Sequence, residues 1–218
     1  MRRPAILTRA ALASLALLAA GAALPAHAQH PDHPPFMPMR DVSVAYDVKL
    51  EGAPSAQRIT VMFSGGGRLM RVDGPDGQGD TILDRDKRLM TIVINSAKVY
   101  MEVPERDELR SPFLLDASMK FTRAGSDHVA GLDCTRWSIT SPSGNATACV
   151  TADGVVLSEG GVDSQGARGH LTAQRVTYDT IPAASFQPPA GYGRVAHPEG
   201  PGSYARGQGA TLTGPQAP

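Results

Sequence analysis

The chain has 218 residues, with 21 lysines and arginines against 21 acidic residues, and 41% of its residues are apolar. This length allows one or two domains, and the apolar share is enough for one sizeable core. Because the charges balance, no basic excess is available to neutralise phosphates, which argues against a nucleic-acid-binding protein. The 23 glycines and 18 prolines disfavour an all-helical bundle.

The first 28 residues have the three parts of a secretory signal peptide. Three arginines make a basic start, and an uncharged apolar run follows from Ala10 to Leu24. The small residues Ala26 and Ala28 stand where a signal peptidase needs them. The apolar run of about 15 residues is shorter than the roughly 20 that span a membrane, although an uncleaved anchor is the alternative. We expect cleavage after Ala28, export to the periplasm and no transmembrane anchor in the mature chain.

Two further segments lack the pattern of a folded domain. Residues 29–40 are rich in proline and are expected to form a flexible leader. Residues 193–218 are rich in glycine and proline and contain almost no large apolar residue. They bury too little surface to offset their ordering entropy, so we expect them to be disordered. The folded domain is therefore expected over residues 41–192.

Apolar and polar residues alternate in the first part of this domain, which predicts β-strands. We expect a hairpin between residues 42–50 and 57–63, with the last residue of the first strand opposite the first residue of the second. A run of three glycines then turns the chain into a third strand, which brings Leu69 opposite Phe63.

Residues 88–95 and 98–103 form the most apolar hairpin of the chain. Pairing Asn95 with Lys98 across the turn sets six apolar side chains in cross-strand pairs on one face. These residues are Met90, Ile92, Ile94, Val99, Met101 and Val103. Burying side chains of this type is worth roughly 1.5–3 kcal/mol each, so we expect this strip to be covered by protein or by a ligand.

The other face of the same hairpin is also apolar, through Leu89 and Val93. Strands that are apolar on both faces are usually covered on both faces. The segment 105–118 offers the only plausible helical cover, and a proline within it limits it to one or two short helices. Phe113 and Leu114 are expected to close the apolar strip only in part, which leaves a slot for an acyl chain.

The two cysteines of the chain lie in neighbouring strands on either side of a turn at 141–143. Pairing Cys134 directly with Cys149 gives a register that also sets Trp137 against Ala146. Two cysteines in an exported protein most often form a disulfide, and cross-strand neighbours come close enough to bond. A redox-active pair would have the C-x-x-C spacing, which these cysteines lack. We therefore expect a structural disulfide.

The sequence contains no catalytic or cofactor-binding motif of the kinds GxSxG, HExxH, GxGxxG or P-loop. His128 and His170 stand alone, without a neighbouring nucleophile or metal ligand. Asp73, Asp76 and Asp80 resemble a calcium loop superficially, but they lack its alternate-residue spacing and its closing glutamate. We therefore expect no enzyme activity, no cofactor and no metal site.

Several short motifs resemble a family of exported bacterial proteins. They are Ile82-Leu83-Asp84 with the apolar hairpin that follows it, residues 129–137, residues 149–157 and the closing FQPPAGY of residues 186–192. In this pattern the chain resembles domain-of-unknown-function family 4412 over roughly residues 41–192. Such proteins resemble the LolA/LolB/RseB architecture. The resemblance implies a curved antiparallel sheet wrapped as an incomplete (half) barrel, with one or two short helices covering the open side.

This architecture implies an apolar concavity suited to acyl chains, and two functional hypotheses follow. The first is a non-enzymatic periplasmic carrier or sensor that holds a lipid or another hydrophobic group. The six-residue strip, Phe113 and Leu114 would face that ligand. The second is an envelope protein–protein interaction or structural module with a filled core and no ligand. Lipid that co-purifies with the protein would distinguish the two.

Overall fold

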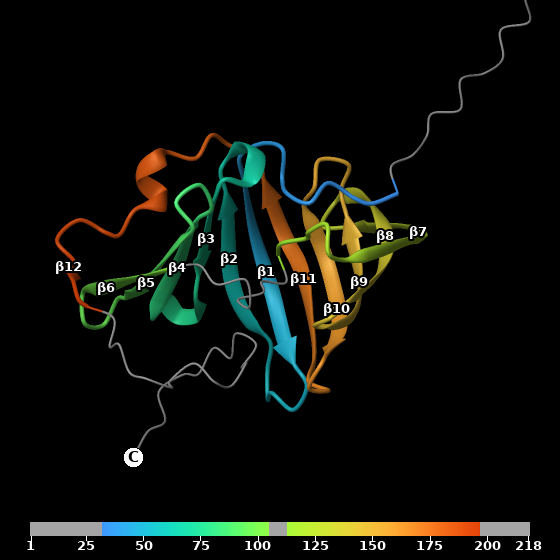
Figure 1. Ribbon diagram of the computed structural model, residues 1–218, viewed down its shortest axis with the longest axis horizontal. Coiled ribbons are helices and arrows are strands. Elements are labelled where there is room, and N and C mark those ends of the chain that lie inside the picture. The colour runs from blue at the N-terminus through green and yellow to red at the C-terminus, as the bar shows by residue number, and fades with distance from the viewer. Residues whose placement is uncertain (1–31, 105–112, 197–218) are drawn as a thin grey trace, which may run out of the picture. The chain divides into compact units, whose positions relative to one another are not determined.

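The computed structural model describes residues 32–104 and 113–196, and these residues are almost entirely β-structure. One curved, open sheet contains twelve strands, and the helices within these ranges are three short 3-10 helices (Figure 1). The expectation of a mainly β fold built on a curved antiparallel sheet is confirmed. Within the same ranges, none of the helices has the length and hydropathy that a membrane-spanning segment requires.

Short connections join most of the strands. Their bounds are β1 Val42–Leu50, β2 Gln57–Phe63, β3 Leu69–Asp73, β4 Gly79–Asp84, β5 Leu89–Ile94, β6 Val99–Pro104, β7 Lys120–Val129, β8 Leu132–Ser141, β9 Gly144–Val150, β10 Val156–Asp163, β11 Arg168–Thr177 and β12 Gly193–Arg194. The 3-10 helices are η1 Gly65–Gly67, η2 Pro75–Gly77 and η3 Ala183–Phe186.

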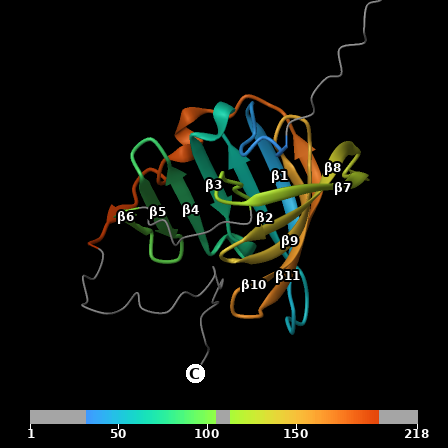
Figure 2. The same cartoon turned by 45° about the vertical axis from the view of Figure 1, so that its right-hand side comes forward.

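The sheet order is β12-β6-β5-β4-β3-β2-β1-β11-β10-β9-β8-β7, so most neighbours are successive hairpin strands. Two pairings join distant parts of the chain: β1 lies antiparallel to β11, and β12 lies parallel to β6. Although three strands separate β7 from β11 in this order, the two strands are in contact, so this end of the sheet curls (Figure 2). We call the face inside the curl the inner face and the opposite one the outer face.

The inner face carries the larger apolar core. Alternation along β1 and β2 places Val44 opposite Val61 and Tyr46 opposite Ile59, and all four side chains are buried. Further buried residues of this core are Phe63, Phe113, Leu115, Trp137, Ile139, Ala148, Leu157 and Leu171. The period of two that predicted the strands therefore also assigns their inward side chains.

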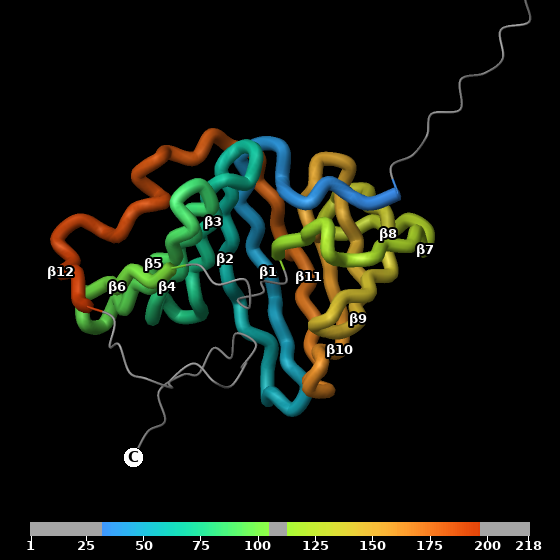
Figure 3. Tube along the Cα trace, viewed as in Figure 1, coloured from blue at the N-terminus to red at the C-terminus, as the bar shows by residue number. Residues whose placement is uncertain are grey.

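The outer face is covered over β3 to β5 by the segment that follows β11. Phe186 of η3 packs with Ile82 of β4 and Val93 of β5, and all three side chains are less than 5% exposed. The segment, orange to red in Figure 3, leaves the end of β11 and reaches the far edge of the sheet, where β12 pairs with β6. The outer face of β3 to β5 is thus covered by the segment that follows β11.

In the described part of the expected cover, Phe113 and Leu115 pack in the inner core and not on this outer face. We expected residues 105–118 to lie there as one or two short helices, whereas residues 181–192 take that place. Residues 105–112 lie outside the described residues, and residues 113–118 form turns and irregular structure without a helix. A hydrophobic pattern shows that a face needs a cover, but it does not show which distant segment supplies it.

The segment before β1, expected to be a flexible leader, makes defined contacts over residues 32–40. Pro38 is fully buried, and the backbone N–H of Met39 donates to the carbonyl oxygen of Asp153 at 2.9 Å. The guanidinium Nε of Arg40 lies 2.9 Å from the Asp153 carboxylate. These contacts differ from our expectation because a proline-rich segment has no hydrophobic period from which packing can be predicted.

The predicted strand registers met with different outcomes. The β5–β6 register is confirmed, with Ile94 opposite Val99. In the β1–β2 hairpin the register differs by two residues, since Val48, rather than Leu50, lies opposite Gln57. A shift of two keeps every side chain on its face, so the apolar pattern could not reveal it. At β3 the shift is one residue: Met70 faces Phe63, and Leu69 turns to the outer face.

Candidate functional site

The predicted apolar strip lies on the inner face near one edge of the sheet. β5 and β6 pair in the predicted register, and the cross-strand row from Ile92 runs through Thr81 and Val72 to Val61 of the inner core. All six side chains of the strip are half-buried: Met90, Ile92, Ile94, Val99, Met101 and Val103. The strip is therefore a row of apolar side chains that stay partly exposed.

The two other predicted ligand-facing residues lie farther along the inner face. Phe113 is buried, and its ring centroid lies 5.1 Å from that of Tyr46 in β1. Leu114 is half-buried against the same core, and the backbone N–H of Leu115 donates to the carbonyl oxygen of Phe36. Phe113 thus lies over β1 and fills part of the inner face there. It does not lie over the strip on β5 and β6.

Sequence reasoning missed the one acidic side chain of β10 that lies among inner-face residues. Glu159 stands opposite Ala148 on one side and Leu171 on the other, and both neighbours are buried. Burial raises the pKa of its carboxyl group from 4.5 to about 7. The signal for it was present, because Glu159 follows the apolar Leu157 by two residues and so shares its face.

Glu159 forms no ion pair with another of the described residues, and burial is the cause of its raised pKa. The nearby hydroxyl of Tyr46 donates instead to the backbone carbonyl of Val156 at 2.6 Å. Burial and, secondarily, the charge of Glu159 raise the pKa of this tyrosine. The carboxyl group of Glu159 therefore lies near the buried hydroxyl group of Tyr46.

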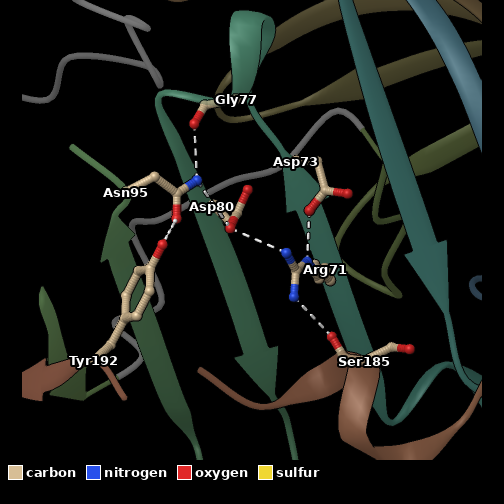
Figure 4. Close-up of polar contacts among 7 residues, drawn as sticks. All are labelled: Arg71, Asp73, Gly77, Asp80, Asn95, Ser185 and Tyr192. Carbon is tan, nitrogen blue, oxygen red and sulfur yellow. Dashed lines mark hydrogen bonds and ion pairs between the residues drawn. The ribbon is translucent and has the colours of Figure 1, made fainter. Parts of the chain in front are cut away.

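A polar cluster on the outer face anchors the segment that follows β11 (Figure 4). The guanidinium group of Arg71 donates to the carboxylates of Asp73 and Asp80 and, at 3.0 Å, to the carbonyl oxygen of Ser185 in η3. Burial, opposed by the charge of Arg71, raises the pKa of Asp80. Arg71 thus connects β3 and β4 to the cover of the outer face.

The same cluster extends to the end of the domain through Asn95. Its side-chain amide nitrogen donates to the carbonyl oxygen of Gly77 at 2.9 Å, and its amide oxygen accepts from the hydroxyl of Tyr192 at 3.1 Å. Of the three aspartates that superficially resemble a calcium loop, Asp73 and Asp80 are bound by Arg71. In the described ranges, no three or more potential metal-ligating side chains gather.

The sulfur atoms of Cys134 and Cys149 lie at disulfide distance, with 5.4 Å between the Cα atoms. The predicted register was wrong, because Arg136 lies opposite Cys149 and Trp137 lies opposite Ala148. The cysteines are therefore diagonal neighbours across β8 and β9.

The cause of this shift is the turn between β8 and β9. Ser141 pairs with Gly144, so only Pro142 and Ser143 form the connection, and the register moves by two residues from the predicted one. Gly144 has a φ of +135°, and a Cβ atom there would clash with the carbonyl oxygen of Val162. The tight turn depends on this glycine.

The two singled-out histidines show no catalytic arrangement. Nδ1 of His128 lies 2.8 Å from a carboxylate oxygen of Asp133, on an exposed part of the β7–β8 hairpin. His170 is exposed on β11, where it stands opposite Lys49 of β1. Among the described residues, neither ring forms a hydrogen bond with a serine, threonine or cysteine side chain.

The fold is shared with solved proteins of low sequence identity. An uncharacterized conserved protein from Thermus thermophilus is 12% identical, with a TM-score of 0.52 over 73% of this chain and 91% of its own. The Pseudomonas aeruginosa MucA/MucB complex matches less well, at 13% identity and a TM-score of 0.45 over 67% of this chain and 55% of that one.

A putative outer membrane lipoprotein-sorting protein domain from Vibrio parahaemolyticus is 11% identical, with a TM-score of 0.31 over 68% of this chain and 89% of its own. The similarity to the Thermus protein shows the fold alone, and the two weaker similarities carry no functional argument. No protein of curated function matches the sequence.

A family model described as a domain of unknown function, DUF4412, matches residues 53–171. The matched range contains the apolar strip, both cysteines and Glu159, and it covers more than half of the chain. The family resemblance of the sequence motifs is thereby confirmed. The chain belongs to the DUF4412 family.

Proposed function

We propose that this chain is a non-enzymatic periplasmic protein that binds a lipid or another hydrophobic group against the inner face of its sheet. In this proposal the curled sheet acts as an incomplete half barrel. The observation that carries it is the six-residue apolar strip, whose side chains are aligned in register on β5 and β6 but only half-buried. A contiguous apolar patch that stays partly exposed often marks a ligand-binding surface.

The energetics favour an apolar occupant. Each 100 Å² of apolar surface that a ligand removes from water contributes about 2.5 kcal/mol. Methionine side chains adapt to irregular partners, and the strip contains Met90 and Met101. The strip therefore suits an alkyl or acyl chain better than a ligand of fixed, rigid shape.

The proposed compartment rests on two independent features. The N-terminal residues carry the pattern of a secretory signal peptide, with cleavage expected after Ala28. Cys134 and Cys149 lie at disulfide distance, and disulfides persist in oxidising compartments such as the bacterial periplasm. Both features support export.

Binding of a neutral fluorescent probe tests the proposal. N-phenyl-1-naphthylamine gains fluorescence in apolar surroundings, so titration should give saturable binding to the full mature chain. Replacing Ile92 with tryptophan fills the strip and should weaken this binding at least fivefold, as should Met101→Trp. The matched control is Ala97→Trp, which places the same indole in the exposed β5–β6 turn and should bind as the unmodified protein does.

The interaction module with a filled core is the second candidate. Phe113 and Leu115 support it, because these buried side chains already occupy the inner face over β1. This candidate predicts that the unmodified protein shows no saturable probe binding and that its organic extract contains no lipid. Those two results together would remove the ligand-binding proposal.

A further inference from the structure

One cross-strand row of the inner face combines apolar side chains with a single carboxylate. From β1 to β8 the row runs Val48, Leu171, Glu159, Ala148 and Trp137, each opposite the next. Leu171, Ala148 and Trp137 are buried, whereas Val48 and Glu159 are half-buried. Glu159 therefore stands in apolar surroundings on the same face as the strip.

The neighbours of Glu159 on the inner face are small or apolar. Ala148 lies opposite Glu159 on β9, and Gly161 follows it by two residues on β10. Alanine has only a methyl side chain and glycine has none, so neither fills the space beside the carboxyl group. Leu157, two residues before Glu159 on β10, is fully buried in the apolar core. The carboxyl group is thus framed by small and apolar groups.

No ion pair joins Glu159 to a lysine, arginine or histidine of the described chain, and burial is the cause of its raised pKa. The arginine at the end of the same row, Arg123, lies three strands away, roughly 14 Å at the usual strand spacing. Its guanidinium group is instead placed over the ring of Trp137, 4.7 Å from the centroid. A carboxylate in a partly desolvated site gains most from a partner of opposite charge, and it repels an anion.

We infer that the ligand of the inner face is an amphipathic molecule whose polar end is a cationic amine, held by the carboxylate of Glu159. Its hydrocarbon part lies on the adjoining apolar surface, over Val48. This inference rests on the proposed function and narrows it, since it excludes a fatty acid with a free carboxylate as the preferred ligand. The inference depends on the attraction between the negative charge of Glu159 and the positive charge of an amine.

Three twelve-carbon amphiphiles that differ only in their polar end test the inference. Dodecylamine, dodecanol and dodecanoate, each below its micelle concentration at pH 8, compete with N-phenyl-1-naphthylamine for the full mature chain. At this pH the probe is uncharged and dodecylamine is a cation. The amine should displace the probe at a concentration at least tenfold lower than the alcohol, and dodecanoate should be the weakest competitor.

The substitution Glu159→Gln keeps the size of the side chain and one acceptor oxygen but removes its charge. In this variant dodecylamine should fall to within twofold of dodecanol, while the affinities for the probe and for dodecanol stay unchanged. The matched control is Glu51→Gln on the exposed β1–β2 turn, which should keep the full preference for the amine.

The outcomes separate this inference from the proposed function. If the probe and dodecanol bind but the unmodified protein does not prefer the amine, or if Glu159→Gln keeps that preference, the inference is overturned and apolar binding stands. If no amphiphile and no probe bind, both are overturned. If only dodecylamine binds, and binding depends on Glu159, the amine site stands and the strip is not a ligand surface.

Discussion

Glu159 should make the stability of the protein depend on pH in an unusual direction. A carboxyl group whose pKa is raised on folding binds more protons in the native state than in the unfolded chain. With a shift from 4.5 to about 7, native and unfolded states differ in protonation between these two values. The free energy of unfolding therefore falls as pH rises through this window, and the loss is complete above the folded pKa.

The magnitude follows from the same shift. One pKa unit corresponds to 1.36 kcal/mol, so a shift from 4.5 to about 7 costs the folded state about 3 kcal/mol when Glu159 is fully ionised. About 2.5 kcal/mol of this cost develops between pH 5 and pH 8. Glu159→Gln does not titrate, so the variant should gain about that much stability over the unmodified protein between these two pH values.

Urea denaturation at pH 5 and pH 8 measures this difference. Trp137, the single tryptophan of the chain, is only 2% exposed and reports unfolding by its fluorescence. Other groups with raised pKa values, such as Asp80, titrate in both proteins and cancel in the comparison. A stability difference between Glu159→Gln and the unmodified protein that is the same at both pH values would refute the reasoning. Glu51→Gln serves as the exposed control and should show no such change.

Three further predictions concern the anchor, the cysteines and the leader. Arg71→Ala leaves the buried Asp80 carboxylate without its cation, so the free energy of unfolding measured in urea should fall by about 3–5 kcal/mol. Arg58→Ala removes the partner of an exposed ion pair and should lower it by less than about 1 kcal/mol. A disulfide that closes a loop of about 15 residues stabilises a protein by roughly 3 kcal/mol, so Cys134→Ser should lower the free energy of unfolding by about this amount. Non-reducing peptide mapping that finds two free thiols would contradict the bond. Intact mass of the exported protein should match cleavage after Ala28, and a retained leader would contradict the proposed export route.

Local patterns in the sequence predicted those parts of the fold that depend on neighbouring residues. The β5–β6 hairpin was predicted with its register, because the apolar residues on both sides of a short turn allow one pairing that keeps them together. The β8–β9 hairpin was predicted as a hairpin but misplaced by two residues. Alternation has a period of two, so it cannot distinguish registers that differ by two.

Contacts between distant segments could not be predicted from such patterns. Phe186 packs on Ile82 and Val93, which lie about a hundred residues earlier in the chain, and no periodicity links them. Glu159 was missed for a related reason: its inner-face position follows from alternation, but the absence of a partner depends on which strands lie beside β10. Such information arises only when the sheet is assembled.

Native mass spectrometry of the protein purified from the periplasm tests the central claim, ligand binding on the inner face, most directly. The account predicts a population heavier than the bare mature chain, whose extra mass is released into organic solvent and is missing from Ile92→Trp. A spectrum that contains only the bare chain for the unmodified protein, under conditions that preserve a known lipid–protein complex, would contradict it.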